Sequence, residues 1–202
     1  TLVGLLLLEE AGLDVAILEI GLGGRLDAVN MIDPDLSIIT SIGLDHQDWL
    51  GDTRELIAIE KAGILRSGVP AICGDEDPPK TLCEEATRVG AAMVYQGRDY
   101  GFQEHASSWD WWHKNPSGQK RGFEGLPLPG LDLLNAATVL EALEHLPLRV
   151  PIAALEAGLR YPKIEGRFQA LRDAQRGLTL RVDVAHNPHA ANLLAKKLHA
   201  AK

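Results

Sequence analysis

Two ionisable side chains in the first quarter of the chain follow apolar runs, and their types suit a divalent metal ion. Glu19 comes directly after Val15–Leu18 and before a glycine-rich loop, and His46 comes shortly after Leu36–Ile42. Near-continuous apolar runs are typical of buried parallel strands, and ligands bind at the carboxyl ends of such strands. A carboxylate and an imidazole at that edge can hold Mg²⁺, which also keeps waters and phosphate oxygens. The alternative is that His46 is an ordinary loop residue.

Lys61 is the unusual residue of the helix that follows. Ile57, Ile64 and Leu65 lie about one turn away, so Lys61 shares the apolar face. The simpler interpretation is a lysine that extends its ammonium group to solvent. The alternative is a lysine with a lowered pKa, whose neutral amine can react with CO2 to form a carbamate. A carbamate would replace a cation by a carboxylate-like anion near the metal.

A second candidate site is the strand-to-helix junction Asp183–His189. Asn187 is expected to cap the last helix and Pro188 to occupy its first position. Helix N-termini favour anions, and Asp183 at the strand end can accept a hydrogen bond from a ribose hydroxyl. The alternatives are that Asn187 is simply a helix cap, or that His186 and His189 form a metal-binding pair.

Neither of two common nucleotide-binding loops is present. Gly21, Gly23 and Gly24 begin a dinucleotide pattern, but Leu26 stands where its third glycine belongs. No lysine follows a glycine anywhere in the chain, so a Walker A loop is absent as well. Spacing alone therefore does not predict ATP binding.

Composition limits the class of protein. The 202 residues, 46% of them hydrophobic, are enough for one domain and part of a second. The net charge of -8 argues against nonspecific binding to nucleic acid or an anionic membrane. Cys73 and Cys83 form neither metal spacing nor a disulfide framework, which favours a reducing, cytoplasmic setting. Leu2–Leu8 is too short to span a bilayer, and a start at Thr1 inside an expected helix suggests a fragment.

The order of elements predicts an α/β fold. Strand–helix alternation up to residue 95 favours a mainly parallel sheet, and the aromatic stretch from Tyr100 to Gly125 indicates an antiparallel hairpin region. Asp52 is expected to cap the helix that carries Lys61. A new unit follows a boundary near residues 161–166. The predicted strands cover residues 15–20, 36–42, 70–73, 92–95, 166–169 and 178–184, and the predicted helices cover residues 1–11, 52–65, 79–89, 132–145, 151–161 and 187 onward.

Taken together and in order, these pieces resemble the folylpolyglutamate synthase/dihydrofolate synthase family of the Mur ligase superfamily. The resemblance extends over nearly the whole chain. It rests on the ordered segments Leu18–Asn30, Thr40–His46 with Asp48–Gly51, Glu60–Ile64, Asn135–Thr138, Gly166–Phe168 and Asp183–Pro188. It implies a P-loop-like Mur ligase central domain over residues 1–163, truncated at its N-terminus, and the start of a Rossmann-like C-terminal domain over residues 164–202.

The resemblance also implies a chemistry. Glu19 and His46 would be ligands of Mg²⁺, Lys61 would be carried as a carbamate, and His186 would join Lys61 as a catalytic residue. The reaction would be ATP-dependent formation of an amide between a pteroate or folate carboxylate and L-glutamate through an acyl phosphate. Mg²⁺ and Arg167 would offset the shifting negative charge.

Substrate positions follow from the same resemblance. The segment Leu26, Asp27 and Ala28 would line the pteroate site. Asn135, Arg167 and Asp183 would contact ATP, the last two from the C-terminal domain as it closes over the nucleotide. We expect a cytoplasmic monomer that binds small molecules, namely dihydropteroate or folates, L-glutamate and ATP, and neither nucleic acid nor a membrane.

Three departures and two alternatives qualify this interpretation. The family's glycine–lysine–glycine–serine phosphate loop would precede Thr1, and the C-terminal domain stops after one or two strands. Leu133 and Leu134 stand where the family often has polar residues or proline. We therefore expect the 202-residue piece itself to be inactive, although its parent would be an enzyme. The alternatives are another Mur-type amide ligase, for a peptidoglycan precursor, and a non-catalytic binding domain of the same fold.

Overall fold

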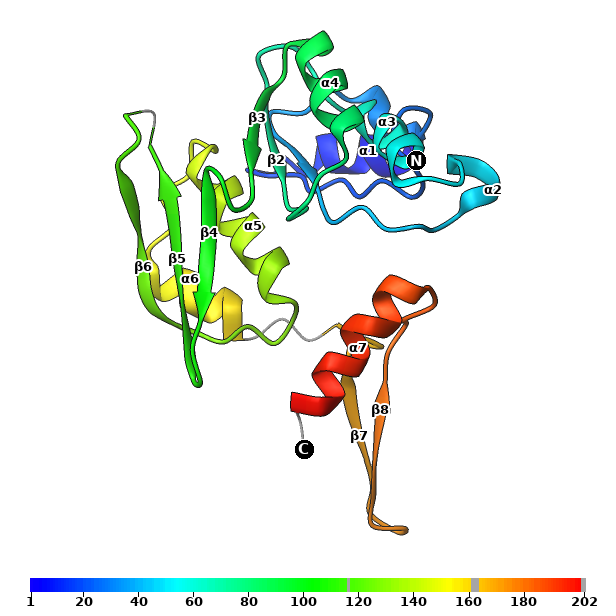
Figure 1. Cartoon of the computed structure of the whole chain (residues 1–202), viewed down its shortest axis with the longest axis vertical. Coiled ribbons are helices and arrows are strands. Elements are labelled where there is room, and N and C mark those ends of the chain that lie inside the picture. The colour runs from blue at the N-terminus through cyan, green and yellow to red at the C-terminus, as the bar shows by residue number, and fades with distance from the viewer. Residues whose placement is uncertain (116, 161–163, 201–202) are drawn as a thin grey trace.

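The computed structural model describes residues 1–115, 117–160 and 164–200, which form three units along the chain (Figure 1). The first unit is a parallel α/β layer, the second an antiparallel sheet with two helices, and the third a hairpin with the last helix. The first unit contains α1 (Leu2–Glu10), the 3₁₀ turn η1 (Ala28–Met31), β1 (Ser37–Ile39), α2 (Gln47–Leu50), α3 (Arg54–Ala62), β2 (Pro70–Cys73), α4 (Lys80–Val89) and β3 (Ala92–Tyr95).

The parallel sheet has the strand order β1-β2-β3, with Ser37 opposite Ala71 and Pro70 opposite Ala92. The helices α3 and α4 pack together and share one apolar core with the strands. Helix α3 joins that core because Ile57, Ala58 and Ala62 fall on its buried face. The predicted alternation of strands and helices, and the parallel sheet that it implies, are confirmed here.

The second unit contains β4 (Tyr100–Glu104), β5 (Ser108–Lys114), β6 (Lys120–Pro127), α5 (Leu133–Glu144) and α6 (Ile152–Arg160). Its three strands are antiparallel, as the aromatic stretch predicts. Trp109 and Trp111 lie two residues apart in β5, and both are buried. Side chains two residues apart in a strand point to the same face of the sheet, which here is the face that packs on the core. Helix α5 contacts both β2 and β4, so it joins the second unit to the first.

The third unit contains β7 (Gln169–Asp173), β8 (Leu178–Val182) and α7 (Pro188–Ala200). The two strands are antiparallel, and Figure 1 shows α7 and the hairpin set apart from the antiparallel sheet β4–β6. The Asn187 Oδ1 atom accepts a hydrogen bond from the Ala190 amide at 2.8 Å, which confirms the predicted helix cap. The predicted domain boundary after residue 163 falls on residues 161–163, which lie outside the described residues.

Four local predictions are wrong. The strand predicted at residues 166–169 is instead mostly a turn, and β7 begins only at Gln169. Residues 15–20 form no strand and pair with none among the described residues, and the Ile17 side chain is 92% exposed. An apolar run becomes a buried strand only where a neighbouring strand and a packed layer cover it, and here neither does. The second predicted strand shortens to Ser37–Ile39. The cap of α3 is Thr53, whose Oγ1 accepts from the Leu56 amide, and not Asp52.

Most of the exposed apolar surface near the N-terminus lies on α1 and the segment after it. No residue of α1 is buried, and Leu2, Val3, Leu6 and Leu7 are each more than half exposed. Within the described residues, none of the helices has both the length and the apolar character needed to cross a bilayer.

Candidate active site

The turn after β1 carries Asp45 and His46, and an ion pair between the half-buried Arg54 and the buried Asp75 fixes the chain just before it. The Ile42 amide donates to Asp75 Oδ2 at 2.6 Å, and Arg54 Nε donates to the Ile42 carbonyl at 2.7 Å. Asp75 is 4% exposed, and its carboxylate also pairs with Arg54 Nη2 at 2.9 Å. His46 has a φ of 50°, a left-handed conformation that a non-glycine residue seldom adopts and that is frequent at functional sites.

The glycine-rich loop is folded around Asp27. Its Oδ2 atom accepts from the Gly21 amide at 2.9 Å, and its Oδ1 atom accepts from the Val29 amide at 2.8 Å. The hydrogen bond from Val29, followed by those from Gly21 and Leu22, lowers the pKa of Asp27 below its ordinary value. This carboxylate therefore holds the loop closed on itself.

The same loop is attached to helix α3. The Arg25 amide donates to the Glu60 carbonyl at 2.9 Å, and Arg25 Nη2 lies 2.8 Å from Glu60 Oε1. Gly63 makes this contact close, because a Cβ at Gly63 would lie 2.5 Å from Arg25 Cα. Lys61 follows Glu60 directly, so the loop and the lysine are positioned by one helix.

A pocket of about 190 Å³ lies between these segments. The glycine loop contributes Gly21 and Gly23, and the turn after β1 contributes Asp45 and His46. Lys61, Asn187 and Ser41 also contribute polar side chains to the lining. Three sites that the sequence singled out separately are thus brought to one place.

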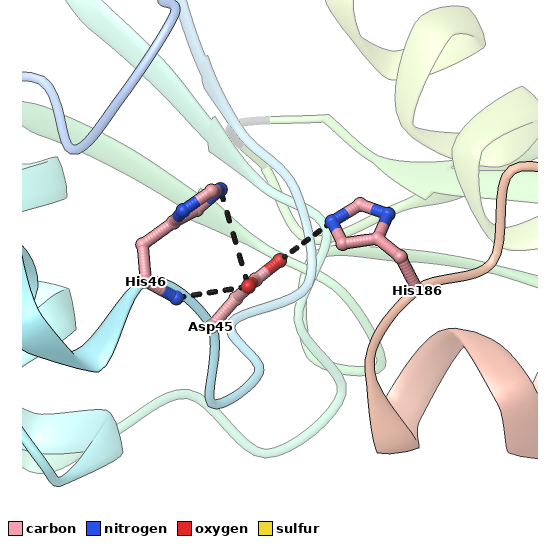
Figure 2. Close-up of side chains that lie close together, drawn as sticks. All are labelled: Asp45, His46 and His186. Carbon is pink, nitrogen blue, oxygen red and sulfur yellow. Dashed lines mark hydrogen bonds and ion pairs between the residues drawn. The ribbon is translucent and has the colours of Figure 1, made fainter.

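Asp45 is the centre of the polar contacts in this pocket (Figure 2). Its Oδ1 accepts from the His46 amide at 2.8 Å, its Oδ2 accepts from Asn187 Nδ2 at 2.8 Å, and His186 Nε2 lies 3.2 Å from Oδ2. The hydrogen bond from Asn187 is the largest cause that lowers the pKa of Asp45, against a smaller opposing effect of burial. One donor atom from each of Asp45, His46 and His186 lies within 4.8 Å of the others.

Lys61 is half-buried on α3. Burial lowers the pKa of its ammonium group, while the negative charge of Asp45 opposes that shift. A lowered lysine pKa increases the fraction of neutral amine, which is the nucleophilic form. The direction of this shift is the one that the predicted reactive lysine requires, and its modification remains a prediction.

Several predicted site residues lie apart from the pocket. Glu19 is exposed and does not line it, although the next residue, Ile20, does; His46 is grouped with Asp45 and His186 instead. Leu26 is 81% exposed, beside Asp27 and the exposed Ala28. Their assignments to metal and pteroate remain predictions.

The three residues predicted to contact ATP are also separate from the pocket lining. Asn135 is exposed in the first turn of α5, and its amide donates to the helix cap Asp132. Arg167 is exposed. Asp183 accepts from the amides of Phe168 and Ala185 at 2.7 and 2.9 Å, so its carboxylate holds the turn around Arg167 in place. Their assignment to ATP likewise remains a prediction.

Two sets of positioning contacts were not anticipated from the sequence. The first is the Arg54–Asp75 pair, and the second is the attachment of Arg25 to Glu60. The partners lie 21 and 35 residues apart, so no local pattern connects them. The position of Asp75 just after the apolar segment Ala71–Cys73 was the one available signal.

Sequence comparison connects this chain to a group of curated proteins, although no protein-family model matches it. It is 43% identical over 215 aligned residues to the dihydrofolate synthase/folylpolyglutamate synthase of Haemophilus influenzae, which covers 100% of this chain and 48% of that protein. It is 44% identical to the Escherichia coli protein of the same name, over 99% of this chain and 46% of that protein. The chain thus spans about half the length of the curated relatives it matches.

Solved structures agree with the sequence comparison. E. coli FolC in complex with DHPP and ADP has a TM-score of 0.88 and 42% identity, over 97% of this chain and 45% of that chain. A bifunctional folylpolyglutamate synthase/dihydrofolate synthase with Mn, AMPPNP and L-glutamate bound has the same TM-score and identity, over 97% of this chain and 46% of that chain. These likenesses confirm the predicted α/β class with one parallel and further antiparallel sheets. The chain is therefore similar, over nearly its whole length, to about half of each of these dihydrofolate synthase/folylpolyglutamate synthases.

Proposed function

We propose that the protein carrying this chain uses ATP to ligate L-glutamate to dihydropteroate, to tetrahydrofolate, or to both. One observation carries the proposal. The glycine loop, His46 and Lys61 line one pocket, in a chain 42% identical to a synthase whose structure contains Mn, AMPPNP and L-glutamate. Residues 1–163 would form the central ATPase domain and residues 164–202 the start of the C-terminal domain.

The donor atoms near the pocket suit a divalent cation. A carboxylate and imidazole nitrogens from Asp45, His46 and His186 lie within 4.8 Å of one another; the carboxylate suits Mg²⁺ or Mn²⁺, and the imidazoles are the type of ligand that transition metals prefer. We propose His46 as one ligand on the basis of this cluster. We propose Glu19 as the other only because the family resemblance implies it, since its exposed carboxylate does not line the pocket. When bound, the ion would supply charge stabilisation for the phosphate oxygens.

The reaction has two steps with balanced atoms. A carboxylate oxygen of the pteroate or folate attacks the γ-phosphorus of ATP, the bond to the bridging oxygen breaks, and ADP leaves. The glutamate nitrogen then attacks the carbonyl carbon of the acyl phosphate, phosphate leaves with the bonding electron pair, and the nitrogen loses a proton. The protein's task is to orient the reactants and to keep water from the acyl phosphate.

The chain's own residues would divide these tasks. Leu26, Asp27 and Ala28 would position the pteroate next to the glycine loop, since Asp27 already fixes that loop. Asn135, Arg167 and Asp183 would hold ATP. Lys61, as a carbamate, would present an anion towards the cation, and His186 would act at the reacting groups from the turn that contacts Asp45. The protein would act as a cytoplasmic monomer.

Glutamate-dependent release of ADP tests this proposal in the protein that carries the chain. Release that requires dihydropteroate or tetrahydrofolate together with L-glutamate supports it. Release only with a nucleotide-linked peptide would assign the protein to peptidoglycan precursors instead. Binding of folate or ATP without any turnover would assign it as a binding domain. A Lys61→Ala variant that regains activity with short carboxylates such as acetate would support the carbamate, and absence of rescue would contradict it.

A further inference from the structure

Asp45 links two parts of the chain that are otherwise separate. The described residues of 164–200 form one part and those of 1–160 the other. The polar contacts that the structure shows between the two parts all involve the Asp45 carboxylate. Asn187 Nδ2 donates to Oδ2, and His186 Nε2 lies close to the same oxygen, across a separation of 142 residues for the Asn187 contact. Neither apolar core includes a described residue of 164–200. The contact between the two parts therefore depends on polar groups.

The groups on both sides of this contact are held in place by their own backbone. Asn187 uses Oδ1 to cap α7 and so has Nδ2 available to donate to Asp45. His186 Nδ1 lies 2.8 Å from the Val184 carbonyl. Asp45 uses Oδ1 to accept from the His46 amide, which leaves Oδ2 for the other segment. Asn187 and His186 thus each have one local contact and one contact to Asp45, and Figure 2 shows the contacts of Asp45 with His46 and His186.

The contact also shapes the pocket. Asn187 belongs to the lining that includes Lys61 and Gly21, and it is contributed by the junction that precedes α7. If this junction moved away from Asp45, the pocket would lose that wall, and Lys61 would become more accessible to water. Water at that place would compete with glutamate for an acyl phosphate.

We propose that Asp45 is a positioning residue whose carboxylate docks the His186–Asn187 turn against the pocket, and so sets its closed form. The catalytic consequence of docking rests on the proposed function, whereas the docking itself does not. Asp45 acts through the residues that it holds and need not touch substrate.

An exchange of the two partners tests the docking. Asn187→Asp keeps a good helix cap but places two carboxylates together, and Asp45→Ala removes the acceptor. We expect both single variants to increase the radius of gyration measured by small-angle X-ray scattering. The double variant Asp45→Asn/Asn187→Asp should restore it, because the amide now at position 45 can donate to the carboxylate now at position 187. Asn187→Ser, which keeps a cap and loses the amide donor, is a further single variant if Asp45→Ala fails to fold.

Two controls separate docking from a general effect of charge and from an effect of metal binding. Asp48→Ala removes the same charge three residues away, from an exposed side chain on α2, and should leave the radius of gyration unchanged. The wild-type value should also be the same with EDTA as with Mg²⁺. Single variants that match the wild type, an exchange that restores nothing, or expansion in EDTA alone would each overturn the proposal. The measurement involves no turnover, so its outcome is independent of the ADP-release assay.

Discussion

Arg25 contacts Glu60 through both its backbone and its side chain, with the Arg25 amide 2.9 Å from the Glu60 carbonyl and Nη2 2.8 Å from Oε1. The glycine-rich loop is thereby attached to α3 immediately before Lys61. An exposed pair of this kind contributes little stability by itself. Its importance is geometric, since it fixes the distance between the loop and the lysine.

The close approach at Gly63 yields a first prediction. Gly63 has a φ of -61°, so alanine is acceptable to the backbone, but its Cβ would lie 2.5 Å from Arg25 Cα. We expect Gly63→Ala to lower the free energy of unfolding by about 1–3 kcal/mol, as overpacking does, and to displace the loop. Urea unfolding measures the effect. The control is Gly158→Ala in α6, where nothing lies within 4 Å and a gain of about 0.5–1 kcal/mol is expected. Equal effects of the two variants would contradict the steric argument.

The Arg54–Asp75 pair yields a second prediction. Arg54→Ala removes the cation from a carboxylate that is 4% exposed, and it frees the Ile42 carbonyl. We expect a loss of about 2–3 kcal/mol in the free energy of unfolding, the usual range for hydrogen bonds to a buried charged group. Arg88→Ala breaks an exposed pair with Glu85 and should cost less than about 1 kcal/mol. If the two variants were equally stable in urea, the Ile42–His46 segment would not depend on Arg54.

Lys61 yields a prediction about pH. Burial lowers its pKa in the folded state below the ordinary value of 10.5, so between these two values the unfolded chain binds more protons than the folded chain. The free energy of unfolding contributed by this group therefore rises with pH in that window, and at lower pH its cost is constant. Lys61→Met should be more stable than the wild type at pH 7, and the difference should shrink towards pH 10.5.

Urea unfolding across that pH range measures the difference between Lys61→Met and the wild type. Lys80→Met is the matched control, because Lys80 is 88% exposed on α4 and pairs with Glu84. The difference in the free energy of unfolding between Lys80→Met and the wild type should not shrink as the pH rises towards 10.5. A Lys61→Met variant that is less stable at pH 7 would show that the ammonium group is stabilising where it lies.

The cysteines yield a fourth prediction. Cys73 is fully buried in β2, and burial raises the pKa of its thiol to about 11, whereas Cys83 is partly exposed on α4. Because thiolates are the reactive form, a maleimide at pH 7 should label Cys83 quickly and leave Cys73 unmodified in the folded chain. Mass spectrometry of peptides distinguishes the two, and both should be labelled in urea. Rapid labelling of Cys73 without denaturant would indicate frequent opening of the parallel sheet.

The sequence was most informative where local chemistry decides the structure. The strands 70–73 and 92–95, the alternation of Trp109 and Trp111, and the Asn187 cap were all predicted, because each depends on propensity, period or capping. The predicted strand at residues 15–20 failed because burial depends on what covers a segment, which composition does not specify. The shift of the cap from Asp52 to Thr53 is the ordinary uncertainty at a helix end.

The candidate site was predictable in part, because residue type and local sequence position single out some of its members. His46 and Lys61 were singled out by residue type, and the structure places both in one pocket. The grouping of Asp45 with His186 and Asn187 joins segments 142 residues apart and follows from the fold alone. Whether Glu19 completes the metal site stays a prediction, since its exposed carboxylate does not line the pocket.

The transfer of oxygen from substrate to phosphate tests the proposed ligase chemistry most directly. Dihydropteroate labelled with ¹⁸O in its carboxylate would be supplied with ATP and L-glutamate to the protein that carries this chain, and the released phosphate analysed by mass spectrometry. If the carboxylate attacks ATP to form an acyl phosphate, each phosphate released in amide formation carries one ¹⁸O. Phosphate without label, released in step with the amide product, would contradict the acyl-phosphate route.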